Sequence, residues 1–326
     1  MRVLFAGTPE PAVASLDALV NSGHEVVGVL TRPDAKIGRK RVLTPSAVAA
    51  RAKQLDLPTI KITSFQGDEG HRAIEEISKL QPDIGAVVAY GGLLPQHVLD
   101  LLPNGWVNLH FSLLPAYRGA APVQWAIINQ EPCTGAAVFQ LEAGLDTGPV
   151  YSTITRDLAP DETAGEVLTD LSHTGAQLLS ETLSSIGDGT AQATPQEGEP
   201  SWAPKLSSRL VKIDPAKPAA AVRGLINGAS PAPGAWGVLE IGGTQPARFK
   251  IGRARPVDEP IETDREPGEF ILEPNRVLLV CQDGVIEVIE VQPSGKKMMR
   301  ATDWARGVED TIRLETSVTH PSEFTQ

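Results

Sequence analysis

The chain has 326 residues, of which 41% are hydrophobic and 21% are charged. This length allows two compact domains, and the composition excludes an extended disordered protein and a membrane-spanning one, because no apolar run approaches the ~20 residues of a membrane helix. A formal net charge of -11 excludes a protein coated in basic surface. The charge is uneven, however, and two basic segments, 32–53 and 205–255, lie in an otherwise acidic sequence.

The first half of the chain alternates short β-branched and apolar runs with helical patterns. We predict strands at 2–6, 25–31, 84–89 and 107–110, and helices at 11–21, 45–56, 69–80 and 95–102. Such alternation predicts parallel strands joined by helical crossovers, and therefore an α/β fold with a Rossmann-like, doubly wound, mostly parallel sheet. Two further strands, 134–141 and 149–155, and one long helix, 163–186, follow.

The composition changes after residue 187. Residues 187–204 are rich in Gly, Pro, Thr and Glu, which is typical of a surface linker. Five short strand-like runs separated by turn signals come next, at 235–241, 248–253, 268–273, 276–282 and 285–292. They predict a small C-terminal antiparallel β-barrel, for which an OB-like barrel is one candidate. We expect one domain at 1–187, a linker at 188–206 and a second domain at 207–326.

The opening residues and the cysteines bear on location and cofactors. Met1 leads straight into strand-like sequence without a charged leader or a cleavage site, so we expect a cytoplasmic protein. Cys133 and Cys281 are too few and too far apart for a disulfide framework or a thiolate metal site. No other cluster of His, Cys and carboxylates has metal-ligand spacing, and we expect no metal.

Polar side chains gather where predicted strands end. Asn108 and His110 are two residues apart near the end of one strand, so their side chains project from the same face. In an open parallel sheet, ligands bind at the carboxyl ends of the strands. The loop 111–125, with two prolines, follows directly, and we expect Asp146, in the turn 142–148, to reach the same place.

An amide, an imidazole and a carboxylate together suit acyl transfer to an amine. Asn108 can stabilise an oxyanion, His110 can stabilise the same charge or move a proton, and Asp146 can fix the imidazole tautomer and raise its basicity. Each residue alone also has a structural interpretation. A histidine near a strand end is more often a structural residue, and Asn and Asp are common in turns. Spacing alone leaves both interpretations open.

The sequence around these residues resembles a known signature. Residues 108–115, 117–125 and 144–148 are similar to the motifs of the formyl-tetrahydrofolate-dependent transferases. The resemblance implies that Asn108, His110 and Asp146 form a catalytic set. It also implies that 10-formyl-tetrahydrofolate is the formyl donor, lying against four residues: Ser112, Leu113, Leu114 and Pro115. Phe111 departs from the pattern, since a small residue is usual there, and we expect it to pack away from His110.

Members of this family differ in their acceptor, which is a purine precursor, an amino sugar nucleotide or methionyl-tRNA. The second domain disfavours the purine type. Resemblance to the branch that acts on methionyl-tRNA is nearly chain-long, at 5–9, 34–46, 202–206, 231–236 and 292–298. It implies transfer of a formyl group to the free amino group of methionyl-initiator-tRNA, giving N-formylmethionyl-tRNA for translation initiation, and a C-terminal domain that touches tRNA. We expect the protein to act as a monomer.

The first basic segment contains a loop that is too polar to pack inside the protein. Its cations are Lys36, Arg39, Lys40 and Arg41. Such a loop is often only a solvated surface feature. Beside a site at the strand ends, it becomes a candidate for binding phosphates at the acceptor end of tRNA. The second basic segment, 205–255, would extend these contacts along the tRNA backbone.

Two alternatives remain at this point. An enzyme of the same family that acts on an amino sugar nucleotide would need neither basic segment. A non-catalytic tRNA-binding protein, built on an enzyme fold that has lost its activity, would not need to keep Asn108, His110 and Asp146. A nicotinamide-dependent reductase is disfavoured, because the opening turn, 7–11, lacks Gly-x-Gly-x-x-Gly and carries two prolines.

Overall fold

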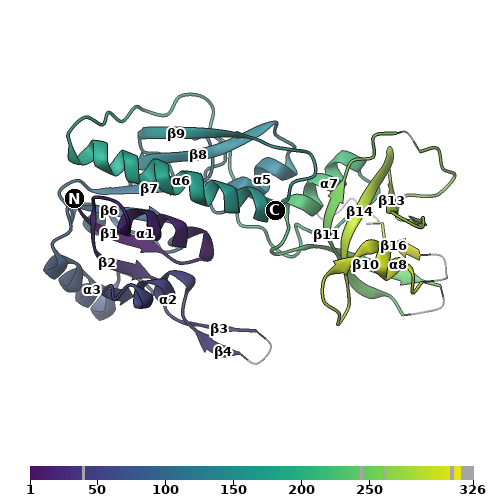
Figure 1. Ribbon diagram of the computed structural model, residues 1–326, viewed down its shortest axis with the longest axis horizontal. Helices are drawn as coiled ribbons and strands as arrows, with labels where there is room; N and C mark the ends of the chain where they lie inside the picture. Colours follow the sequence, from purple (N-terminus) through teal and green to yellow (C-terminus); the bar gives the residue numbers. More distant parts are fainter. Residues whose placement is uncertain (39–40, 243–244, 260, 309–311, 317–326) are drawn as a thin grey trace. The chain divides into compact units, whose positions relative to one another are not determined.

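The computed structural model describes residues 1–38, 41–242, 245–259, 261–308 and 312–316 (Figure 1). Its contacts divide the chain into two compact units. Unit 1 consists of Met1–Pro122, Thr134–Arg156 and Leu168–Ala203, and unit 2 of Val123–Cys133, Asp157–Val167 and Pro204–Gln326. The chain therefore passes from one unit to the other several times. No helix in the described ranges is long and apolar enough to cross a membrane.

Unit 1 is built on a seven-stranded sheet with the order β5-β2-β1-β6-β7-β8-β9 (Figure 1). In that order the strands are Thr59–Lys61, Glu25–Thr31, Arg2–Gly7, Ile84–Val88, Trp106–His110, Cys133–Gln140 and Val150–Asp157. The pairs from β5 to β7 are parallel, and β7 pairs with β8 in antiparallel orientation. The predicted mostly parallel α/β sheet is confirmed.

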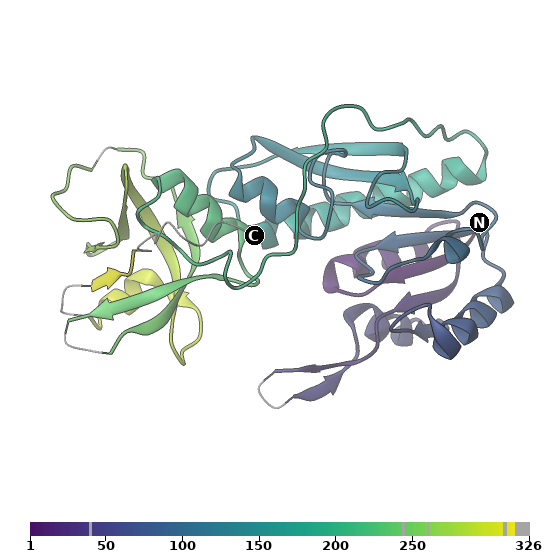
Figure 2. The same cartoon turned by 180° about the vertical axis from the view of Figure 1, so that it is seen from behind.

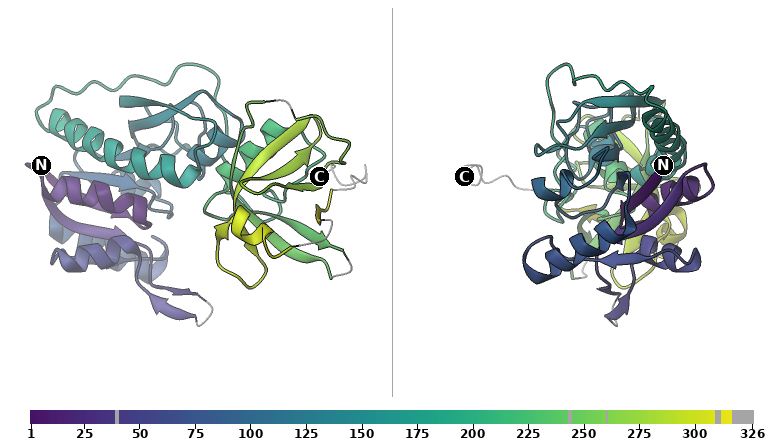
Figure 3. Two further views of the ribbon diagram at one scale, coloured as in Figure 1. Left: turned by 45° about the vertical axis from the view of Figure 1, so that its right-hand side comes forward. Right: turned by 90° about the vertical axis from the view of Figure 1, so that its left-hand side faces the viewer.

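Helices cover both faces of this sheet (Figure 3). The helices α3 (Gly67–Leu80) and α4 (Gln96–Leu99) contribute Ala73, Ile77 and Val98 to a core that also contains Trp106 of β7. The apolar side chains of α3 recur at helical spacing. The acidic residues in its first turn and the basic residue in its last turn interact favourably with the helix dipole. On the other face lie α1 (Val13–Val20) and α6 (Ala164–Gly187). The first half of the chain also contains α2 (Ala47–Gln54) and α5 (Pro122–Ile128).

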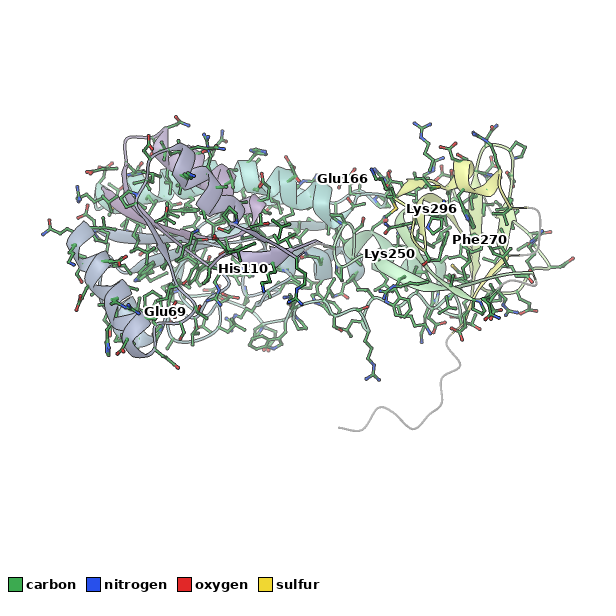
Figure 4. The ribbon with its side chains drawn as sticks, turned by 90° about the horizontal axis from the view of Figure 1, so that it is seen from below. Glu69, His110, Glu166, Lys250, Phe270 and Lys296 are labelled. Atoms are coloured by element: carbon green, nitrogen blue, oxygen red, sulfur yellow. The ribbon has the colours of Figure 1, made fainter. Side chains whose placement is uncertain are left out.

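Unit 2 contains an antiparallel sheet, whose strands are drawn in green to yellow in Figure 2. Their order is β12-β13-β14-β11-β10-β16, and β15 pairs with β14. These strands are Phe270–Leu272, Val277–Cys281, Gly284–Pro293, Ala247–Arg255, Ala235–Ile241, Ile312–Leu314 and Met299–Arg300. A bridge between Glu269 and Arg313 brings the two ends of the sheet together, so the barrel is nearly closed. Phe249, Phe270 and Trp304 pack ring against ring in its core, where Figure 4 marks Phe270. The predicted barrel is confirmed.

Several elements differ from the sequence prediction. The basic loop forms a hairpin of β3 (Ala35–Ile37) and β4 (Val42–Thr44). Two helices, α7 (Ala219–Gly228) and α8 (Ala301–Ala305), were not predicted, nor were the short strands β5, β15 and β16. Residues 188–206, all of them described, contain no helix or strand. Nevertheless Thr194 pairs with Val150, and Ala203 is fully buried.

Candidate active site

The end of β7 places Asn108 and His110 on the same face of the sheet. This strand pairs Asn108 with Val87 of β6 and with Phe139 of β8, and His110 with Ala137 of β8. The His110 residue is only 6% exposed, and Figure 4 marks its side chain. Asn108 is partly exposed, and its side-chain amide donates to none of the residues that the structure describes. The amide is therefore available to a ligand.

A backbone carbonyl sets the tautomer of His110. Nε2 of the ring lies 2.9 Å from the carbonyl oxygen of Tyr117. A carbonyl can only accept, so Nε2 carries the proton in the neutral ring and Nδ1 carries the lone pair. Nδ1 is 3.9 Å from Oδ2 of Asp146, which is too long for a hydrogen bond. We expected Asp146 to fix the tautomer; in the structure Tyr117 does so, and Asp146 acts through its charge.

Burial and charge act in opposite directions on His110. Burial lowers the pKa of His110 and is the larger effect, while the Asp146 carboxylate and the Tyr117 carbonyl partly offset it. The pKa therefore lies below its ordinary value, and the ring is neutral at physiological pH. A neutral ring with its lone pair on Nδ1 can accept a proton there. The imidazolium then formed would face the Asp146 carboxylate.

Asp146 is held in a strained turn. Its φ is +52°, in the left-handed region that non-glycine residues seldom adopt. The Gly119 N–H donates to Oδ2 at 2.8 Å and orients the carboxylate toward His110. On the backbone side, Nε2 of Gln196 donates to the carbonyls of Asp146 and Gly148, at 2.8 and 2.9 Å. Oε1 of Gln196 in turn accepts from Nε and Nη2 of Arg118, at 3.2 and 2.6 Å.

A second segment pairs with the loop that carries Tyr117. The Tyr117 N–H donates to Oγ of Ser201, and the Arg118 N–H donates to the Ser201 carbonyl, both at 2.8 Å. The Ala203 N–H donates to the Arg118 carbonyl, also at 2.8 Å. Gly119, at φ +124°, must be glycine here, since a Cβ would lie 2.8 Å from the Ala203 carbonyl oxygen. These bonds fix the Tyr117 carbonyl, and so His110.

The segment Ser112–Pro115 leaves β7 directly after His110. Ser112 is buried, and its hydroxyl donates to the Ala116 carbonyl at 2.6 Å, so it shapes the loop. The three residues that follow it are partly exposed, which offers an apolar surface beside His110. Phe111, which we expect to pack away from His110, is buried.

The predicted tRNA-binding cations are not part of this cluster. Arg39 and Lys40 lie outside the described residues. Lys36 and Arg41 belong to the β3–β4 hairpin, where Ile37, Val42 and Leu43 are also exposed. Several cations of the second basic segment form ion pairs with described residues: Arg253 with Asp161 and Glu166, Arg255 with Glu287, and Lys212 with Glu315. Figure 4 labels Glu166.

Sequence reasoning singled out Asn108, His110 and Asp146 and missed the groups that hold them. The supporting groups are the Tyr117 carbonyl, the Gly119 N–H and the side chains of Arg118, Gln196 and Ser201. Backbone groups leave no signal in a sequence, and Gln196 stands in a segment of linker-like composition.

In the described part of the chain, no group of three or more His, Cys, Asp or Glu could hold a metal ion.

Comparison with known proteins identifies the family of this chain. Residues 1–183 match the formyl transferase family, and residues 205–309 match the C-terminal domain of formyl transferases. The chain belongs to the formyl transferase family. A relative in this family, the methionyl-tRNA formyltransferase of Arthrobacter sp. (strain FB24), is 51% identical over 312 residues, which cover 94% of this chain and 97% of the relative.

Solved structures of other proteins share the fold of this chain. One is WlaRD, a sugar 3N-formyl transferase studied in the presence of dTDP and 5-N-formyl-THF, with a TM-score of 0.65 at 17% identity over 91% of this chain and 99% of that one. Another is HypX from Aquifex aeolicus in complex with tetrahydrofolic acid, with a TM-score of 0.60 at 16% identity. The match to HypX covers 93% of this chain and 46% of HypX.

Proposed function

We propose that this protein transfers the formyl group of 10-formyl-tetrahydrofolate to the free amino group of methionyl-initiator-tRNA. The product is N-formylmethionyl-tRNA for translation initiation. The main support for this proposal is the arrangement at the end of β7. His110 is buried and neutral, and its Nδ1 lies on the side of Asp146. The side-chain amide of Asn108, two residues earlier, donates to none of the described residues. The acceptor follows from the relatives, since the methionyl-tRNA formyltransferase match extends over both the catalytic unit and the barrel.

The donor is assigned to the surface that follows His110. Leu113, Leu114 and Pro115 present a partly exposed apolar face, which suits the flat ring system of a folate. Two fold relatives have been crystallised with folates. We therefore assign the donor to Ser112–Pro115, where Ser112 keeps the loop in shape and the formyl carbonyl lies near Asn108 and His110.

The chemistry assigned to the three residues is direct transfer. The methionyl amine attacks the formyl carbon, and Nδ1 of His110 takes a proton from the amine. The Asn108 amide donates a hydrogen bond to the formyl oxygen as negative charge builds there. The Asp146 carboxylate stabilises the imidazolium. The bond from the formyl carbon to N10 of the donor then breaks, N10 takes up a proton, and tetrahydrofolate leaves.

The tRNA contacts follow the two basic segments. Lys36, Arg39, Lys40 and Arg41 would bind phosphates at the acceptor end, and the domain at 207–326 would contact the backbone further along. Domain boundaries at 187 and 207 are part of this proposal. We also propose that the protein acts as a monomer and is located in the cytoplasm, where charged tRNA is found. Because Arg253 and Arg255 are already ion-paired, they are poor candidates for this role.

A formylation assay tests the proposal. Purified protein is incubated with 10-formyl-tetrahydrofolate and one acceptor at a time: methionyl-initiator-tRNA, methionyl-elongator-tRNA or an amino sugar nucleotide. The proposal predicts rapid formylation of the initiator alone. Formylation of the amino sugar nucleotide would assign the protein to the other branch of the family. Binding of tRNA without any formylated product would indicate a tRNA-binding protein that has lost enzymatic activity.

A further inference from the structure

Trp202 is a large aromatic side chain that the fold leaves exposed. Its residue is 58% exposed, whereas the next residue, Ala203, is fully buried. The backbone on either side is fixed, because Trp202 forms a parallel bridge with Arg118, closed by hydrogen bonds from Arg118 to Ser201 and from Ala203 to Arg118. The indole therefore stands on rigid backbone and loses little conformational freedom when a ligand packs on it.

A short path of hydrogen bonds connects the backbone segment of Trp202 with the reacting groups. Ser201, its neighbour, accepts from the Tyr117 N–H, and the carbonyl of Tyr117 holds His110. In a parallel pair, bridged residues project to the same face, which places Trp202 on the side of Arg118. Arg118 contacts Gln196, which holds the Asp146 turn. Trp202 thus lies on the segment that supports the site.

The charges around Trp202 indicate what it binds. The exposed residues just before it include Glu197 and Glu199. With Arg118 bridged to Trp202 and the exposed Lys205 after it, the charge is mixed and forms no cluster of cations for a phosphate, whereas the uncharged face of a base can pack on the indole. The apolar surface assigned to the folate lies earlier in the loop, at residues 113–115, whereas Trp202 pairs with its later part, at Arg118.

We propose that Trp202 is the stacking platform for the terminal adenine of the tRNA acceptor end. This inference rests on the proposed function, because the methionine that receives the formyl group is esterified to the ribose of that same nucleotide. The acceptor end is single-stranded, so its last base is free to stack. Stacking on an aromatic side chain is insensitive to the sequence elsewhere in the tRNA and would position the ester, and with it the amine, beside His110.

A coupling experiment tests this contact. Dissociation constants are measured at one salt concentration for deacylated initiator tRNA with its terminal adenine and for the same tRNA ending in an abasic ribose. Each is measured with the wild type, with Trp202→Ala and with Trp202→Phe. Leu210→Ala is the matched control, since Leu210 is 50% exposed and belongs to unit 2. Truncation of so exposed a side chain leaves no internal cavity, and thermal melting checks that the variants fold.

We expect Trp202→Ala to weaken binding of the intact tRNA by about 5-fold to 150-fold, the range of one base–aromatic stack. The same variant should bind the abasic tRNA as the wild type does, and Trp202→Phe should retain part of the affinity. Equal losses on both tRNAs would overturn the inference. A rise in KM for the folate with unchanged tRNA binding would overturn it too, in favour of a folate contact. Failure of the wild type to formylate methionyl-tRNA would instead refute the proposed function.

Discussion

Replacing Gln196 with Ala tests whether the Asp146 turn is held in place for catalysis. The substitution removes two hydrogen bonds that Gln196 donates, to the carbonyls of Asp146 and Gly148, and two that it accepts from Arg118. The two donated bonds contribute a net of about 1 to 3 kcal/mol to holding the turn. Asp146 at φ +52° costs about 1 to 2 kcal/mol. The two energies are of similar size.

Without Gln196 the strained turn therefore relaxes in a large share of molecules, and the Asp146 carboxylate leaves His110. We expect kcat to fall by about 10-fold to 100-fold, the scale set by those bonds and by a displacement of about 1 Å in a catalytic group. KM for the tRNA should change by less than about 3-fold, because Gln196 supports the reacting groups and not the residues assigned to the phosphates. Steady-state formylation at saturating tRNA measures kcat, and a tRNA titration measures KM.

Gln196→Glu is the control that separates the two halves of this interaction. A carboxylate still accepts from Arg118 but cannot donate to the Asp146 and Gly148 carbonyls, so kcat should fall as it does in Gln196→Ala. The pKa of His110 should also fall in both variants, because a displaced carboxylate no longer raises it. A Gln196→Ala enzyme with wild-type kcat, or a Gln196→Glu enzyme that keeps full activity, would show that Gln196 does not hold the Asp146 turn for catalysis.

Three further predictions concern the site and the hairpin. His110→Ala removes the proposed proton acceptor and Asn108→Ala the proposed oxyanion donor, so single-turnover formylation should slow by about 10²-fold or more in each; near-normal turnover of His110→Ala would overturn the mechanism. Asp146→Asn removes the charge that raises the pKa of His110, so a nitrogen NMR titration should show that pKa falling further, with the neutral ring protonated on Nε2; an unchanged pKa would contradict the assignment. Lys36→Ala combined with Arg41→Ala should weaken tRNA binding and reduce the slope of log affinity against log salt by up to about two, with kcat at saturating tRNA unchanged; a weakening independent of salt would count against phosphate contacts.

The sequence predicted the parts of the fold that have strong periodicity. The strands at 25–31 and 235–241 were predicted with the bounds of β2 and β10, because β-branched runs between turn signals are locally decisive. The β5 strand has three residues and is stabilised by pairing with β2, which a local pattern cannot show. The α7 helix contains two glycines and few charges, so its pattern was too weak to predict, although it packs on β11 and β14.

The candidate site was predictable only as a set of side chains. Asn108, His110 and Asp146 were chosen from their chemistry and from family resemblance. Their geometry depends on the Tyr117 carbonyl and the Gly119 N–H, and every residue has such groups. Gln196 stands in a polar segment, 188–206, which composition indicated as linker, yet this segment supports the turn and the loop around His110. Tertiary hydrogen bonds of this kind have no local signature.

A competition for one labelled formyl group tests directly which acceptor the protein uses. The protein is given 10-formyl-tetrahydrofolate labelled in the formyl carbon, with methionyl-initiator-tRNA and an amino sugar nucleotide present together at equal concentration. Hydrolysis of the tRNA ester then releases its amino acid for analysis. We expect the label to appear as N-formylmethionine and His110→Ala to abolish most of it. Label in the sugar, or label released only as formate, would contradict it.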